Sequence, residues 1–236
     1  MSKMERPFDE ELKALKEKLL GMASRAEEQI ALAIRGLKDR EEKLACQVLD
    51  REESINLLDI EIDEMCMRLL ALRQPMATDL RFITSAMKIS NDLERIGDLA
   101  VNIAERTIDL LKSPQLKPLI DIPRMAQLSQ DMVRDALNAF VNLDDKLARD
   151  VCERDDKVDD LNNQVFRELL TYMMEDPGTI SRAVDLILVG RHLERIADHA
   201  TNIGEDVIYM VKGKTIKHHI EEGGRATHLK SCPVDE

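Results

Sequence analysis

Apolar residues recur every three or four positions along most of the chain, which predicts amphipathic helices. After Pro7 one such pattern runs without interruption to about Lys38. A second helix is predicted over 41–73 and ends before Pro75, because proline disfavours a helical conformation at the preceding residue and has no backbone N–H. A third helix is predicted over 78–112.

The second half of the chain repeats this order. A cluster of prolines over 113–122 and at its far edge predicts a linker. Helices are then predicted over 123–142 and 144–174, followed by a break at Asp-Pro-Gly 176–178 and a last helix ending near Lys212. The fold class is therefore all-α, with three helices occurring twice. The expected domains are 8–112 and 123–212, joined by the 113–122 linker and followed by a flexible tail over 213–236.

An internal duplication supports this division. Residues 91–105, NDLERIGDLAVNIAE, return almost unchanged as RHLERIADHATNIGE at 191–205. Both copies keep one apolar helical face, which a core needs. They also keep a polar face, which a core does not need, in Glu94/Glu194, Asp98/Asp198 and Asn102/Asn202. The middle helices are paired too, since VLDRE at 48–52 aligns with VCERD at 151–155.

Composition and charge exclude several classes of protein. The formal net charge of the 236 residues is −12 and aromatic residues make up 3%, which argues against nucleic-acid binding. No stretch approaches the roughly 20 apolar residues that span a bilayer, and the N-terminus is too charged for a signal peptide. We therefore expect a soluble cytoplasmic protein. Its four cysteines are widely spaced, without a zinc or disulfide pattern.

The polar faces are the candidate functional sites. In each repeat, oxygen side chains on the middle helix could face those on the last helix and form a cluster. Carboxylates about 5 Å apart repel by about 3 kcal/mol at an effective dielectric constant near 20, which a cation or nearby arginines must offset. The candidate metal ligands are Glu52, Asn56, Glu94, Asp98 and Asn102 in the first repeat, and Asp155, Asp159, Glu194, Asp198 and Asn202 in the second, with Asp59 a weaker candidate.

Two interpretations of these faces remain open. All-oxygen ligands favour magnesium, manganese, iron or calcium, with zinc also compatible. Alternatively, the faces are salt-bridged, because Arg95 lies three residues from both Asp92 and Asp98, and Arg195 lies three residues from Asp198.

Signatures of catalysis are missing from the sequence. The Glu-x-x-His pattern of di-iron bundles does not occur, and neither does a Gly-x-Ser-x-Gly elbow or a glycine-rich phosphate loop. His192 and His199 are interpreted as surface residues or satisfied core residues. We expect no catalytic nucleophile and no organic cofactor.

The segment RQPMATDLR at 73–81 followed by LERIGD at 93–98, and TYMMEDPGTI at 171–180 followed by LERIAD at 193–198, resembles the PhoU family of phosphate-uptake regulators. The resemblance spans roughly residues 8–212. It implies two three-helix bundles, six helices in all, related by a pseudo-twofold axis. It also implies a cytoplasmic homodimer without enzymatic activity.

The resemblance further implies a regulator of phosphate uptake and a negative regulator of the phosphate-starvation response. Such a protein contacts the ATPase subunit of the phosphate ABC transporter and the phosphate-responsive histidine kinase, and it meets the membrane only through these partners. Family motifs that hold iron or zinc in some members map onto Glu52–Asn56, Glu94–Asp98, Asp155–Asp159 and Glu194–Asp198. Asn56 replaces a carboxylate, so we expect the second repeat to hold metal better. The alternative function is a metal-carboxylate enzyme. We do not expect the protein to sense phosphate directly.

Overall fold

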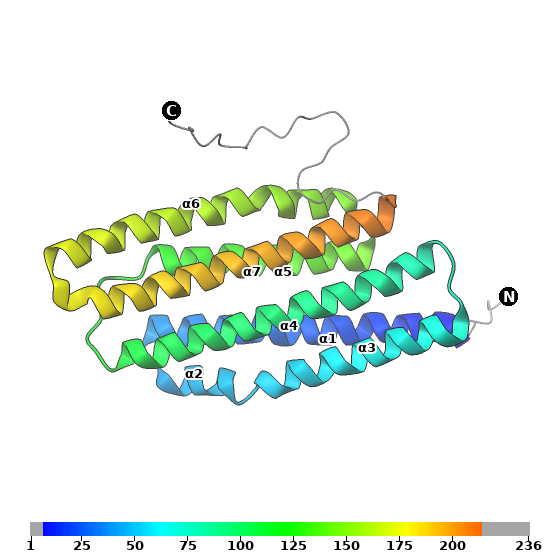
Figure 1. Ribbon diagram of the computed structural model, residues 1–236, viewed down its shortest axis with the longest axis horizontal. Helices are drawn as coiled ribbons and strands as arrows, with labels where there is room; N and C mark the ends of the chain where they lie inside the picture. The colour runs from blue at the N-terminus through cyan, green and yellow to red at the C-terminus, as the bar shows by residue number, and fades with distance from the viewer. Residues whose placement is uncertain (1–6, 214–236) are drawn as a thin grey trace, which may run out of the picture.

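The structure, a computed structural model, describes residues 7–213, and these form helices joined by short connections (Figure 1). No strand occurs within this range. The elements in order are α1 (Pro7–Asp39), α2 (Glu42–Leu49), α3 (Glu52–Arg73), α4 (Thr78–Leu111), α5 (Asp121–Asn142), α6 (Asp145–Glu175), the short 3-10 helix η1 (Pro177–Thr179) and α7 (Ile180–Lys212). The all-α fold class is confirmed.

The second predicted helix is interrupted, because it divides into α2 and α3 at Asp50–Arg51. The N–H of Arg51 bonds to the carbonyl of Val48, in a tighter turn than an α-helix makes. The carbonyl of Arg51 then accepts bonds from the backbone N–H of Ser54 at 3.1 Å and from its hydroxyl at 2.7 Å. A serine hydroxyl that bonds to a nearby carbonyl competes with the helical ladder. The corresponding stretch of α6 is continuous.

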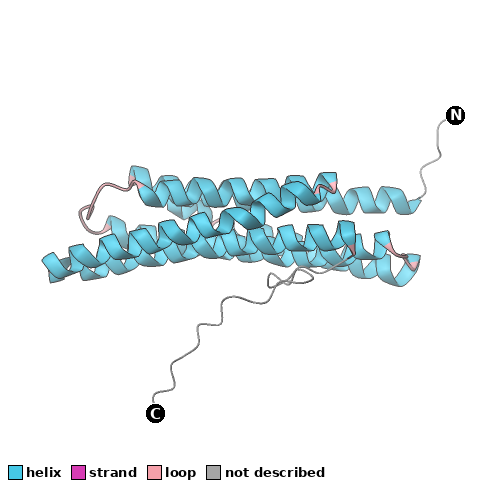
Figure 2. Cartoon of the chain, turned by 90° about the horizontal axis from the view of Figure 1, so that it is seen from above, coloured by secondary structure: helices cyan, strands magenta, loops and turns pink. Residues whose placement is uncertain are grey.

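The helices form two layers, which Figure 2 shows from the side. One layer contains α3, α4, α7 and α6 in that order, and α1 and α5 pack behind it, with α2 against α1 and α4. The first repeat comprises α1 to α4 and the second comprises α5 to α7. Helices α4 and α7 run antiparallel at the centre and form the junction between the repeats (Figure 1).

The two repeats fill equivalent core positions with different side chains of matching total size. In the first repeat Ile55 packs against Gly97, whose Cβ, if present, would lie 3.0 Å from Ile55 Cδ1. In the second repeat, the residues at these positions are the smaller Val158 and the larger Ala197, both fully buried. Because protein interiors are close-packed, a larger side chain at one of these two positions requires a smaller one at the other.

The last helix ends at Lys212, where Gly213 adopts a left-handed conformation with φ 69° and donates its N–H to the carbonyl of Tyr209. The rest of the tail expected over 213–236 lies outside the described residues. Within 7–213, no helix is both long enough and apolar enough to cross a bilayer.

Candidate functional site

The second repeat brings four carboxylates together across α6 and α7. Asp155 and Asp159 lie one turn apart on α6, and Glu194 and Asp198 lie one turn apart on α7. Burial raises the pKa of Asp155 to about 6, and the negative charges of Asp198 and Asp159 add to the effect. Burial followed by the charge of Asp198 also raises the pKa of both Asp159 and Glu194. We call these four residues the second-repeat cluster.

Little positive charge compensates this cluster. Arg191 forms an ion pair with Glu194 at 2.9 Å. Among the described residues, the predicted ion pair between Asp198 and Arg195 does not form. Two buried oxygens, Asp155 Oδ1 and Glu194 Oε2, have no hydrogen-bond partner in this part of the chain. Buried carboxylate oxygens without donors are costly, so this donor set suits a hard cation.

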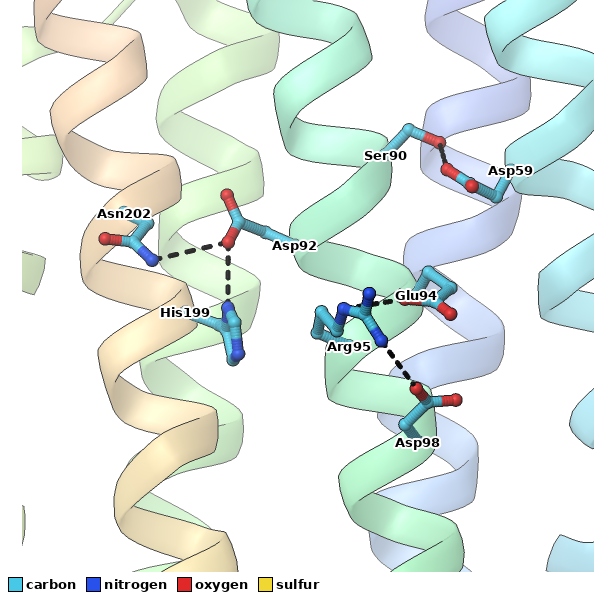
Figure 3. Close-up of polar contacts among 8 residues, drawn as sticks. All are labelled: Asp59, Ser90, Asp92, Glu94, Arg95, Asp98, His199 and Asn202. Atoms are coloured by element: carbon cyan, nitrogen blue, oxygen red, sulfur yellow. Dashed lines mark hydrogen bonds and ion pairs between the residues drawn. The ribbon is translucent and has the colours of Figure 1, made fainter.

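The first repeat differs because an arginine occupies its polar face. Arg95 forms ion pairs at 3.3 Å with both Glu94 and Asp98 (Figure 3). The prediction that Arg95 pairs with Asp98 is therefore confirmed. Burial, followed by the charge of Asp98, raises the pKa of Glu94, and the charge of Asp59 contributes in the same direction. This face is partly neutralised without any metal, although Glu94 Oε2, like Glu194 Oε2, has no hydrogen-bond partner among the described residues.

The middle helix of the first repeat carries the expected residues near its start, where Glu52 is exposed and Asn56 is half-buried. Asp59 lies further along α3 and accepts a hydrogen bond from Ser90 Oγ at 2.6 Å (Figure 3). The negative charge of Asp59 also helps to raise the pKa of Glu94, so Asp59 lies near this site.

Asn202 continues the polar face of α7 in sequence but turns away from the second-repeat cluster in space. Four residues of an α-helix rotate by about 400°, so each step of four drifts about 40° around the axis. Two such steps from Glu194 bring Asn202 toward α4, where it donates a hydrogen bond to Asp92 at 3.3 Å (Figure 3). Asn102 forms no side-chain hydrogen bond within residues 7–213.

Sequence reasoning missed a polar site at the junction of the repeats. Asp92 does not pair with Arg95 but contacts His199 Nδ1 at 2.8 Å across the junction (Figure 3). Nearby, Lys88 bonds to the buried carboxylate of Asp206 at 2.9 Å and lies over the ring of Tyr209. These contacts border a cavity of about 460 Å³, lined by Asp59, Asp63, Met87, Lys88, Asn91, Asp92, Asn202 and Asp206.

The only sequence signal for this junction was that His199 has no counterpart in the first copy, since residue 99 is a leucine. The contacts of His199 and Asn202 with Asp92 each span more than a hundred positions. Identifying them requires the register of α4 against α7, which the sequence does not supply.

The clusters are not closed as metal sites. Within residues 7–213, no three His, Cys, Asp or Glu side chains are placed so that they could hold one ion together. Binding at the second-repeat cluster therefore requires its side chains to rotate inward. The thiols of Cys66 and Cys152 are not activated, because burial raises the pKa of Cys66 to about 12 and that of Cys152 to about 11.

Comparison with known proteins gives a consistent result. The PhoU domain model matches residues 19–107 and again 122–207. The "Phosphate-specific transport system accessory protein PhoU homolog" of Aquifex aeolicus is 45% identical over 215 residues, covering 91% of this chain and 97% of the relative.

Two solved structures are similar throughout. The crystal structure of PhoU from Pseudomonas aeruginosa matches with a TM-score of 0.85 and 43% identity, covering 88% of this chain and 100% of that one. The phosphate transport system regulatory protein PhoU from Streptococcus pneumoniae matches with a TM-score of 0.83 and 31% identity, covering 88% and 98%.

Proposed function

The chain belongs to the PhoU family, and on this premise we propose that it regulates phosphate uptake and restrains the phosphate-starvation response. Its relatives carry the names of accessory and regulatory proteins of phosphate transport, not of enzymes. The observation that carries the proposal is the match of the family model to both repeats, which together make up most of the chain.

The proposed mode of action is that of a cytoplasmic adapter. It contacts the ATPase subunit of the phosphate ABC transporter and the phosphate-responsive histidine kinase, works as a homodimer, and reaches the membrane only through these partners. An open layer of four helices, α3, α4, α7 and α6, supports this role, because it presents a broad surface to other proteins. We also propose that the two repeats span residues 8–112 and 123–212.

A metal ion at the second-repeat cluster is the second element of the proposal. Asp155, Asp159, Glu194 and Asp198 would hold a cation such as iron, zinc, manganese or magnesium. When bound, the ion supplies positive charge that neutralises this face and links α6 to α7. The first-repeat cluster is a weaker candidate, because Arg95 already pairs with Glu94 and Asp98.

The alternative of a metal-carboxylate enzyme receives less support. Such an enzyme needs an open coordination position inside a closed pocket. Asp198 is instead exposed on the surface of α7. The described buried thiols are held protonated, and so they offer no nucleophile in its place.

The testing experiment is elemental analysis of the full chain purified without chelator or affinity tag. It compares the native protein with the double variant Asp159→Ala, Asp198→Ala, and uses Glu153→Ala, an exposed position on α6, as the matched control. We expect metal in the native and control proteins and loss of metal in the double variant. Equal metal content in all three would reject the second-repeat cluster as the site.

The adapter role is tested separately, by measuring binding of the native chain to the purified transporter ATPase and to the cytoplasmic part of the kinase. Binding to neither would reject the proposed function. In the same series, calorimetric titration with inorganic phosphate is expected to show no tight binding.

A further inference from the structure

The outer face of α3 carries large apolar side chains that are more than half exposed. Leu57 is 52% exposed, Ile60 55% and Met67 59%. Together with the exposed Glu64 and Ala71, these residues follow the alternating three-and-four spacing of a coiled-coil seam. Because α3 lies at the edge of the four-helix layer and packs on α1 and α4, this face points away from the core (Figure 1). We call these five residues the α3 stripe.

The fold itself does not require an apolar residue at position 57 or 60, as the second repeat shows. The buried residues of α3 and α6 correspond in order: Ile55 with Val158, Ile62 with Val165, and Cys66 with Leu169. In this register the exposed Leu57 and Ile60 correspond to the exposed Asp160 and Asn163. Met67 and Ala71 correspond to Leu170 and Met174, which are apolar and exposed in α6 as well. Leu57 and Ile60 are therefore the residues of the stripe that indicate a purpose other than packing of the bundle.

The surroundings of the stripe are acidic. Glu53 continues it by one turn, Glu64 lies within it and Asp63 flanks it, whereas Arg68 is the one basic residue between positions 53 and 68. Glu61, on the other flank, is paired with Lys18 of α1. Asp63 also lines the junction cavity, where Asp59, Asp92 and Asp206 extend the negative charge. An apolar seam with acidic flanks complements a seam with basic flanks.

We propose that the α3 stripe is a docking surface for an amphipathic helix of a partner protein, one with apolar side chains at heptad spacing flanked by lysines and arginines. The inference depends on the proposed adapter function in one respect only, which is the identity of the partner protein that carries this helix. Packing of the α3 stripe against the same stripe of a second copy of this chain is disfavoured, because Glu61, Asp63 and Glu64 would meet like charges. An anionic membrane surface is repelled for the same reason.

The surface chemistry is tested with the full chain and a defined probe. The probe is a fluorescein-labelled peptide of three heptads, with leucine at the seam positions and lysine at the flanking positions, and the matched control peptide has glutamate in place of lysine. Fluorescence anisotropy at low and high salt measures binding. We expect the lysine peptide to bind and the glutamate peptide not to bind, with affinity decreasing as salt screens the charges.

The decisive variant gives α3 the residues of α6, Leu57→Asp with Ile60→Asn. It should weaken binding of the lysine peptide about tenfold or more, since two apolar anchors are lost. The control Met174→Gln, at an apolar residue that is 84% exposed on α6, should bind as the native chain does. A second variant, Asp63→Lys with Glu64→Lys, should weaken binding of the lysine peptide and allow the glutamate peptide to bind, an outcome that loss of folding could not produce.

Equal affinity of the lysine peptide for the native chain and for the Leu57→Asp, Ile60→Asn variant would overturn the inference, and so would no binding to the native chain. The same variant is then measured against the purified transporter ATPase and the cytoplasmic part of the kinase. If the native chain binds either protein and the variant binds it equally well, the inference fails while the proposed function stands. If the native chain binds neither, the proposed function fails, and the peptide measurements alone decide on the surface.

Discussion

Replacing Asp155 by asparagine is expected to stabilise the metal-free protein at neutral pH. Burial and the neighbouring Asp198 and Asp159 raise the pKa of this carboxyl from 3.8 to about 6, so ionising it opposes folding. Asparagine keeps the size and polarity of the side chain and removes the charge. The oxygen that lacks a hydrogen-bond partner, Asp155 Oδ1, then no longer belongs to an anion.

The magnitude follows from the displacement of the pKa. The interval between 3.8 and about 6 corresponds to at most roughly 3 kcal/mol, at 1.36 kcal/mol per pH unit. Because Asp155 is only half-buried, solvent screening reduces this to about 1 kcal/mol. In a chain of this length, about 1 kcal/mol changes Tm by roughly 2–4 °C.

The pH dependence has a definite sign. The pKa of Asp155 is higher in the folded than in the unfolded chain, so the folded state binds the proton more tightly. The native protein therefore gains stability from this group as the pH falls through about 6 toward 4, and it loses that stability as the pH rises again. The Asp155→Asn protein should lack this contribution.

The assay is thermal unfolding followed by circular dichroism in the presence of EDTA, at pH 7.5 and pH 4.5. We expect Asp155→Asn to have a higher Tm than the native chain at pH 7.5 and a similar Tm at pH 4.5. Glu153→Gln, at an exposed position on the same helix, is the control and should change neither value. A lower Tm for Asp155→Asn at pH 7.5 would refute the reasoning, because it would show that the ionised carboxylate stabilises the metal-free fold.

Three further predictions concern stability, each measured as the free energy of unfolding in urea. Phe140→Ala should cost about 4 kcal/mol, since Phe140 is fully buried and its ring centroid lies 5.3 Å from that of the stacked Phe82. A cost below about 1 kcal/mol would contradict this packing. Asp144→Ala should cost about 1 kcal/mol, because the carboxylate caps α6 by accepting two backbone N–H bonds, and an unchanged value would show that the cap contributes nothing. Gly97→Ala should cost about 1 kcal/mol by crowding Ile55, and adding Ile55→Val should recover most of it; purely additive effects would refute that coupling.

Helical spacing and proline positions were enough to predict most of the fold. The bounds of α4 and α6 agree with the prediction to within about a residue, because Pro75 and Asp-Pro-Gly 176–178 interrupt helices through backbone chemistry that acts locally. The break at Asp50–Arg51 was not predicted. The Ser54 hydroxyl bonds to the Arg51 carbonyl at this break, but serine also occurs inside many continuous helices.

The candidate site was predicted less completely, for a physical reason. Spacing along each helix places Glu194 with Asp198, and Asp155 with Asp159, on one face, so the members of the second-repeat cluster follow from the sequence. Which residues of another helix meet a given face depends on axial register and crossing angle. For this reason the pairing of Asp92 with His199 was not foreseen.

The interruption between α2 and α3 makes the two repeats unequal in how they open to solvent. An isolated helix of eight residues is far below the length that persists in water, so α2 depends on Ala45 and Val48 packing against its neighbours. The matching part of α6 is one stretch of a helix of 31 residues and shares its cooperativity. Amide protons of α2 should therefore exchange with deuterium well before their counterparts near the start of α6, making α2 a separate unit of local unfolding.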